Sequence, residues 1–442
     1  MKRVLLIAYY FPPLGWSGVQ RTLKYIKYLR EFDWEPTVVT VCDTKFSVRD
    51  ESLFQELPKD IEVIRLPDVF LKGITDQMLK ELLELVKPAY DLIENKQLKT
   101  SYLDQIQAKI AELRNMLLLP DGNIIWAKNV IDKINQKIAL NDFDIIYSTS
   151  GPYSDHIIGF YLKKECGLPW VADFRDEWTN NSYYNFTKES IRYQVEKHLE
   201  NKIVLAADQI ITVSPVSTNN YQQIFKVSTA KMTTIPNGYD EEDFLELETY
   251  PDSDRFSIIH NGSFYLQRNP YTFLKALENL IRTGEIDEEK VLIEFIGIVD
   301  DNIKAKVNQL PIDRLINWAG YLTHQESLAK ALQANLLLLV IGPGEKMKSI
   351  CPGKIFEYLR LGKPILSLSP TGSVVDQLLQ ETGHGNNVEY DDKQGIEKLI
   401  IKKYRDWLAG KRLTINRQAI QKYERRYLTQ QLAELFDSLI KY

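Results

Sequence analysis

Apolar runs of strand length alternate with amphipathic helical stretches along most of the chain. Near the N-terminus the apolar run 4–10 precedes the helical pattern 18–32, which precedes the apolar run 36–42. Strand, helix and strand in this order form a βαβ unit, in which the sheet is parallel and covered on both faces. The same alternation continues over residues 144–214. The pattern therefore predicts one doubly wound α/β domain.

A second alternating series starts at residue 256 and runs to about residue 381. One of its helices is expected to open at a capping box formed by Thr323 and Glu326. Between the two series lies a turn-rich, acidic stretch, IPNGYDEEDF (235–244), which suits an interdomain hinge. The chain thus predicts a second doubly wound domain after the hinge.

The predicted boundaries follow from these patterns. We expect a first Rossmann-like domain over 1–240 and a second over 241–405, with closing helices over 406–442 that pack back on the first domain. A helix-rich, charged segment at about 71–140 interrupts the first series and is interpreted as an insertion. It is either a solvated cover for the sheet or a surface for an acceptor or a membrane.

Composition and charge argue against several classes of function. The 442 residues are enough for two ordinary cores, and a net charge of −5 argues against a nucleic-acid partner. The three cysteines form no CxxC pair and the five histidines no HExxH motif, so neither a disulfide framework nor a metal site is expected. The N-terminus is interpreted as a buried strand and not as a signal peptide, so we expect a cytoplasmic protein.

Two loops after predicted strands carry glycines that suit a phosphate site. In FPPLGWSGVQR, Gly15 and Gly18 precede a helix whose N-terminal amides favour an anion. In HNGSFYLQRNP, Gly262 lies at the turn and Arg268 near the next helix, where a guanidinium can grip a diphosphate. The competing explanations are a tight turn for the glycines and a solvated cation for Arg268.

The stretch GPGEKMKSICPGKIFEY contains a third candidate. It superficially resembles a P-loop, but Met347 stands where the second glycine is required, so the ATPase interpretation is rejected. What remains is a helix that begins near Gly353 and Lys354 and carries Glu357 one turn later. The amides and Lys354 suit phosphate, and a carboxylate at 357 suits ribose hydroxyls. Alternatively, Lys354 and Glu357 are an exposed helical pair.

Acidic residues directly after a strand are candidates for acid–base chemistry. Asp173 and Asp176 lie in VADFRDEW, and His156 lies in the first turn of the preceding helix. We expect these side chains to face a crevice between the domains, where ligands of such sheets bind. The alternatives are an Asp–Arg ion pair that fixes the loop and a structural histidine.

Taken in order, these segments resemble the retaining glycosyltransferases of family 4, which have the GT-B fold of two facing Rossmann-like domains. The resemblance covers nearly the whole chain. It implies that Gly15 and Gly18 lie under the donor diphosphate, that Arg268 neutralises it and that Glu357 holds the nucleotide ribose. The family's first glutamate, which contacts the donor sugar, falls on Ser349, and one cation of the usual pair is missing after Gly262.

The resemblance implies a retaining, metal-independent transfer from a nucleotide-diphosphate sugar to a glycan or lipid-linked acceptor, in surface polysaccharide synthesis and without a cofactor. Peripheral attachment to a membrane is a further expectation for the insertion. Two alternatives stay open. Ser349 and Ser263 favour a sugar-nucleotide-binding protein that transfers nothing, and other GT-B proteins are nucleotide-sugar epimerases or hydrolases.

Overall fold

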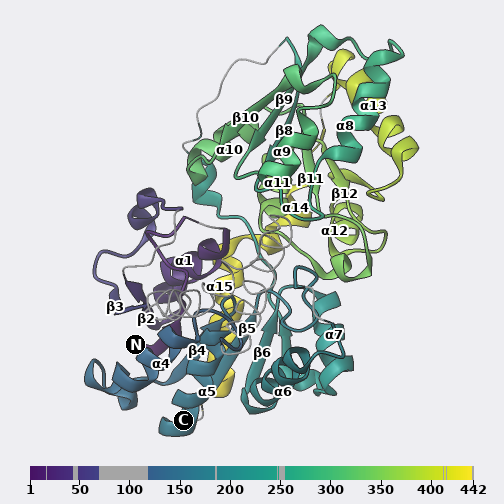
Figure 1. Ribbon diagram of the computed structural model, residues 1–442. Helices are drawn as coiled ribbons and strands as arrows, with labels where there is room; N and C mark the ends of the chain where they lie inside the picture. The colour runs from purple at the N-terminus through teal and green to yellow at the C-terminus, as the bar shows by residue number, and fades with distance from the viewer. Residues whose placement is uncertain are drawn as a thin grey trace, which may run out of the picture.

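The computed structural model consists of two parallel α/β domains that the chain crosses between twice (Figure 1). It describes residues 1–15, 17–42, 48–68, 118–184, 187–245, 247, 254–411, 413–414 and 416–440. Each domain contains one sheet with helices on both sides. The prediction of two doubly wound domains is therefore confirmed.

The first domain is built on a seven-stranded sheet with the order β3-β2-β1-β4-β5-β6-β7. Its strands are β1 (Lys2–Ile7), β2 (Trp34–Cys42), β3 (Glu62–Pro67), β4 (Ile145–Thr149), β5 (Trp170–Phe174), β6 (Gln209–Thr212) and β7 (Met232–Thr234). Its helices are α1 (Ser17–Leu29), α4 (Ile124–Lys133), α5 (Ser154–Cys166), α6 (Ile191–Ala206) and α7 (Pro215–Phe225). The short 3-10 helix η2 (Glu51–Glu56) follows β2.

The second domain has a six-stranded sheet with the order β10-β9-β8-β11-β12-β13. Its strands are β8 (Phe256–Asn261), β9 (Val291–Ile296), β10 (Ile316–Gly320), β11 (Leu336–Val340), β12 (Ile365–Leu368) and β13 (Gly385–Val388). Its helices are α8 (Tyr271–Arg282), α9 (Asp301–Val307), α10 (His324–Leu332), α11 (Lys354–Leu361), α12 (Val374–Thr382), α13 (Lys393–Leu408) and α14 (Arg417–Ile420), with the 3-10 helix η9 (Glu345–Ser349) before α11. Helix α10 opens at the predicted capping box of Thr323 and Glu326.

Continuous apolar runs form the central strands because both faces of each sheet are buried. In β1, Leu5 and Ile7 belong to one core cluster, whereas Val4 and Leu6 belong to another on the opposite face. Several of the elements that the sequence pattern missed are polar or very short. β13 reads GNNV, β7 has three residues, and α7 reads PVSTNNYQQIF.

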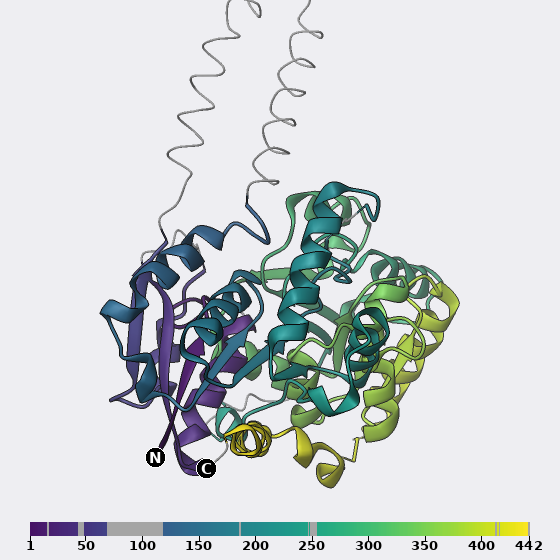
Figure 2. The same ribbon diagram turned by 90° about the horizontal axis from the view of Figure 1, so that it is seen from below.

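The last long helix, α15 (Arg425–Leu439), returns to the first domain (Figures 1 and 2). It packs beside α1, and Leu428, Leu432 and Phe436 join Val4 and Leu6 in one core cluster. Helix α13 lies on the second domain beside α8. The predicted insertion is described only from residue 118, where α4 packs on α5; residues 71–117 lie outside the described part of the chain.

The expected hinge segment is attached to the first domain. Arg21 of α1 donates to the carbonyls of Ile235 and Pro236, both at 2.9 Å. Lys24 and Lys27, one turn apart on α1, form ion pairs with Asp240 at 2.8 and 2.7 Å. Buried charges therefore fix residues 235–240 to α1, and the interdomain hinge over 235–244 stays a prediction.

The two crossings between the domains lie side by side. The Tyr239 amide donates to the Tyr423 carbonyl at 3.1 Å, and the Arg425 amide donates to the Tyr239 carbonyl at 2.8 Å. Gly238 lies so close to the Tyr423 carbonyl that a Cβ there would collide with it. Backbone hydrogen bonds thus join the chain that leaves the first domain to the chain that comes back.

Among the described helices, none combines the length and the apolar character that crossing a bilayer requires.

Candidate active site

Two cations of the second domain gather at the carboxyl end of β8. Lys354 opens α11, and its ammonium lies against Gly262, whose φ is +125°. A Cβ at Gly262 would collide with the Lys354 Nζ, so only glycine leaves room for this lysine. Arg268 is 9 % exposed and lies over the rings of Tyr183 and Tyr265, with its guanidinium carbon 5.5 and 5.4 Å from their centres.

Neither cation is neutralised by a carboxylate. Within the described ranges, no hydrogen bond or ion pair reaches the Lys354 ammonium. The Arg268 guanidinium donates to the Tyr183 hydroxyl, and its buried Nε has no partner among the residues described. Burial, with Arg268 adding to it and Glu357 opposing it, lowers the pKa of Lys354 to about 7. This arrangement favours an anion that would satisfy both groups.

Glu357 points to His324 and not to Lys354. The Nε2 of His324, the first residue of α10, lies 3.0 Å from the Glu357 Oε1. Burial alone would lower the pKa of His324, but Glu357 and then Asp243 raise it to about 9. His324 also lowers the pKa of Glu357 against the effect of burial. The alternative of an exposed Lys354–Glu357 pair therefore fails, because the carboxylate is largely buried and is paired elsewhere.

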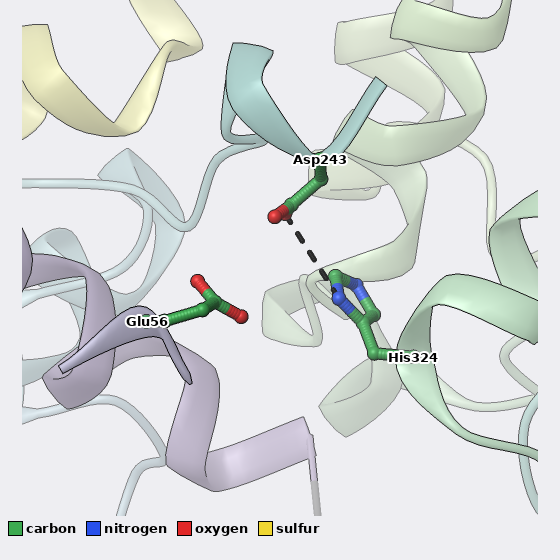
Figure 3. A group of neighbouring side chains, drawn as sticks. All are labelled: Glu56, Asp243 and His324. Atoms are coloured by element: carbon green, nitrogen blue, oxygen red, sulfur yellow. Dashed lines mark ion pairs between the residues drawn. The ribbon is translucent and has the colours of Figure 1, made fainter. Parts of the chain in front are cut away.

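His324 faces a group of charges where the two domains meet (Figure 3). Its Nδ1 lies 3.9 Å from the Asp243 Oδ2, and Glu56 of η2 lies on the opposite side. Glu56, Asp243 and His324 are close enough to hold a metal ion. However, the Lys24 ammonium already pairs with Glu56 and with Asp243, the latter at 2.6 Å. A metal would have to displace a buried lysine, which disfavours such a site.

Ser349, at the end of η9, contacts the first domain. Its hydroxyl donates to the Lys346 carbonyl at 3.4 Å and lies beside the carboxylate of Glu177, which accepts from Asn180 and from Asn220. Glu177 is 6 % exposed, and burial raises its pKa. A carboxylate of the first domain therefore lies beside the serine at which the family resemblance implies a glutamate.

The loop between β1 and α1 faces other protein groups. A Cβ at Gly15 would collide with the Tyr321 hydroxyl of the second domain, and one at Gly18 would collide with the Arg175 guanidinium. Arg175 donates to the Gly151 carbonyl at 3.0 Å, and its Nε lacks a partner in the described part of the chain. Because Gly18 has no side chain, the Arg175 guanidinium can lie close to the N-terminus of α1, which is compatible with an anion site there.

Two of the three predicted catalytic side chains are buried. Asp173 is fully buried and forms a bidentate ion pair with Arg21, at 2.7 and 3.1 Å. His156 is also fully buried, and its Nδ1 lies 2.8 Å from the Ser148 Oγ. Burial lowers the pKa of His156 to about 3. The prediction that these two face a crevice is wrong, and the alternative of an Asp–Arg pair holds with Arg21 as the partner.

Asp176, the third predicted catalytic residue, is exposed. It follows β5 in the segment that continues to Glu177 and to Tyr183, the two residues that contact Ser349 and Arg268. Asp176 is therefore the one predicted catalytic carboxylate that solvent or a substrate can reach.

His324 and Tyr183 were not predicted as site residues, whereas Glu177 belongs to the charged cluster in VADFRDEW that the sequence indicated. His324 stands at the carboxyl end of a strand, directly after the capping threonine, which is the signal that the sequence offered. Glu177 and Tyr183 act across the domain interface, and no pattern within one segment reveals such a contact.

The fold is similar to that of known proteins. Residues 91–243 match the sequence model of Glycosyltransferase Family 4. HepE from Anabaena, solved with UDP and glucose, is similar in structure with a TM-score of 0.64 and 14% identity, over 99% of this chain and 100% of that one. Sucrose-phosphate synthase from Thermosynechococcus elongatus has a TM-score of 0.66 and 13% identity, over 99% of both chains. WaaG, a glycosyltransferase involved in lipopolysaccharide biosynthesis, has a TM-score of 0.59 and 11% identity, over 98% and 99%.

A search of curated proteins finds no match. The fold is that of the GT-B glycosyltransferases, and the expectation of that fold is confirmed. Within it, the chain carries a Glycosyltransferase Family 4 domain over residues 91–243.

Proposed function

We propose that this protein is a retaining, metal-independent glycosyltransferase that moves a sugar from a nucleotide-diphosphate sugar to a glycan or lipid-linked acceptor. The observation that carries the proposal is the pair of cations at Gly262. Lys354 and Arg268 lie near each other, and neither forms an ion pair with a carboxylate among the described residues; Glu357 follows one turn after Lys354 on α11. In this proposal the diphosphate lies against the two cations and the ribose hydroxyls bind Glu357.

The cations would stabilise the charge that develops on the leaving diphosphate, which is the role a metal ion has in other transferases. The bond between the anomeric carbon and the diphosphate oxygen breaks, and its electron pair stays on the diphosphate. The acceptor oxygen bonds to the same face of the sugar, and its proton passes to the diphosphate. Lys354 supplies the second cation that the sequence pattern after Gly262 lacks.

The acceptor class is supported by the neighbouring structures. WaaG is involved in lipopolysaccharide biosynthesis, and HepE was solved with UDP-glucose. A role in surface polysaccharide synthesis, on a glycan or lipid-linked acceptor at the membrane surface, is therefore part of the proposal.

A panel of nucleotide sugars tests the proposal. A ligand present at a hundred times its dissociation constant adds about 2.7 kcal/mol to the free energy of unfolding, which a thermal shift detects. We expect one UDP-, GDP- or ADP-sugar to raise the melting temperature and Glu357→Ala to remove the rise. Glu345→Ala, a surface change in η9, is the control and should keep it. If no nucleotide sugar stabilises the wild-type protein, the proposal fails.

Glu177 gives a second prediction, because it brings a carboxylate to Ser349. We propose that it contacts the donor sugar, and expect Glu177→Gln to lower kcat by about tenfold or more, the loss of a charge-assisted hydrogen bond. Affinity for UDP, which lacks the sugar, should change less than twofold. The exposed Glu189→Gln change in the same segment is the control. Unchanged turnover in Glu177→Gln would contradict this role.

A second candidate function is a sugar-nucleotide-binding protein without transfer activity. The burial of Asp173 and His156 favours it, because it leaves Asp176 as the one predicted catalytic carboxylate within reach. Tight nucleotide binding without a glycosylated product from glycan or lipid extracts would support this function. Donor consumption without any acceptor would instead support an epimerase or a hydrolase.

A further inference from the structure

Charges of alternating sign connect the proposed donor site with the first domain. Glu357 of α11 pairs with His324 of α10 at 3.0 Å. The other ring nitrogen of His324 faces Asp243, which lies in the crossing segment and pairs with Lys24 of α1 at 2.6 Å. Lys24 also pairs with Glu56. This row of charges therefore runs from Glu357 on α11, through Asp243 in the segment that crosses between the domains, to Lys24 on α1.

His324 is held at the centre of this row from several sides. Its backbone amide donates to the Asp50 Oδ2 of the first domain at 3.4 Å. The charged groups that face its ring are Glu357 from α11, Asp243 from the crossing, Lys24 from α1 and Glu56 from η2. Three carboxylates and one ammonium favour the doubly protonated imidazolium, which can donate from both nitrogens.

In this row of charges, the hydrogen bond between His324 and Asp243 is not formed. The His324 Nδ1 is buried and has no hydrogen-bond partner among the described residues, because the Asp243 Oδ2 at 3.9 Å is beyond hydrogen-bond distance. A shift of about one ångström between α10 and the crossing would complete the bond. The hydrogen bond between the His324 Nε2 and the Glu357 Oε1 is already formed. It fixes one oxygen of the carboxylate and leaves the other oxygen for a ligand.

We propose that His324 is a positioning residue of the donor site, which holds Glu357 for the ribose with Nε2 and engages Asp243 with Nδ1 when the donor binds. This inference rests on the proposed function, since it assigns the ribose to Glu357. It adds a residue that touches no substrate and a connection between donor binding and the crossing. Loss of the imidazolium should then weaken ribose binding and leave diphosphate binding unchanged.

The test compares His324→Gln and His324→Ala with wild type, using UDP and inorganic pyrophosphate as probes. His324→Gln is expected to weaken UDP binding about fivefold and His324→Ala about twentyfold, as expected for a lost charge-assisted hydrogen bond. In the proposed site pyrophosphate is held by Lys354 and Arg268 and not by Glu357, so its affinity should stay within twofold. His198→Gln, on the exposed face of α6, is the control and should bind both as wild type does.

The pH profile separates positioning from general destabilisation. Because the pKa of His324 is about 9, the imidazolium loses its proton above pH 9. Above this pH the plot of the logarithm of wild-type UDP affinity against pH should therefore fall with an additional slope of one proton, and His324→Gln should lack this extra slope. Wild-type UDP binding with an unchanged slope in His324→Gln would overturn the inference. If a His324 variant does not fold, Asp243→Asn should still move the onset of the extra slope to a lower pH, because Asp243 raises the pKa of His324. Failure of wild type to bind UDP would overturn the proposed function instead.

Discussion

Replacing Lys354 by methionine is expected to weaken binding of the nucleotide diphosphate by about ten- to a hundredfold, because a charge-assisted hydrogen bond contributes about 1.5–3 kcal/mol. Methionine keeps the length of the side chain and removes the ammonium at Gly262. Titration calorimetry with UDP or another bound nucleoside diphosphate measures the change. Lys348→Met, in the preceding 3-10 helix, removes a lysine that pairs with Glu345 and is the control.

Proton uptake provides a second measurement on the same variant. Because the Lys354 pKa is about 7, much of the wild-type protein at pH 8 carries a neutral lysine. A bound diphosphate favours the ammonium, so binding at pH 8 should take up a proton, which calorimetry in buffers of different ionisation enthalpy detects. Lys354→Met should take up fewer protons. Equal uptake in the two proteins would assign the proton to another group.

Lys354→Met weakens nucleotide binding but should stabilise the free protein. At pH 6 the charged Lys354 lies beside Arg268, so methionine should raise the melting temperature of the free protein. The folded pKa of about 7 lies below the ordinary value of 10.5, so the unfolded chain binds more protons between these pH values. The contribution of Lys354 to wild-type stability therefore rises with pH across that window. Lys354→Met should lack this rise. If the variant were both less stable than wild type and unable to bind the nucleotide, its loss of binding would be explained by misfolding and not by the missing ammonium.

Replacing Arg21 by methionine is expected to cost about 3–5 kcal/mol of the free energy of unfolding, because it leaves a buried charge without its partner. Arg21 forms the bidentate pair with Asp173 and also binds the carbonyls of Ile235 and Pro236. Urea unfolding, followed by the fluorescence of tryptophans that include Trp170 in β5, measures the loss.

A double variant shows whether Asp173 is structural. Arg21→Met with Asp173→Asn removes both charges, so it should be more stable than Arg21→Met alone. Arg405→Met, which removes the exposed partner of the exposed Glu285, is the control and should cost less than about 1 kcal/mol. A small loss in Arg21→Met, similar to that of the control, would show that the pair contributes little and would reopen a chemical role for Asp173.

The fold could be predicted from the sequence because buried parallel strands are continuous apolar runs. LLLLV at 336–340 and VLIEFI at 291–296 are read correctly without any structure, and so is the helix Ser154–Cys166. GNNV at 385–388 is not, because a strand at the sheet edge needs fewer apolar residues.

The candidate site could be predicted only in part. Gly262, Arg268, Lys354 and Glu357 were identified because each lies in a loop or helix start after a strand. The partners of these residues lie far away in the sequence, as His324 does for Glu357 and Tyr183 for Arg268. Asp173 and His156 were misassigned because an acid or a histidine after a strand looks the same whether it faces solvent or the core.

Helix α15 has a consequence for the order in which the protein folds. The face of the first sheet that contains Val4 and Leu6 is covered by Leu428, Leu432 and Phe436, which lie more than 400 residues further along the chain. During synthesis, therefore, the first domain emerges from the ribosome with part of one apolar face uncovered. The second domain can complete its own core earlier, so the half of the protein that is made first is the half that is finished last.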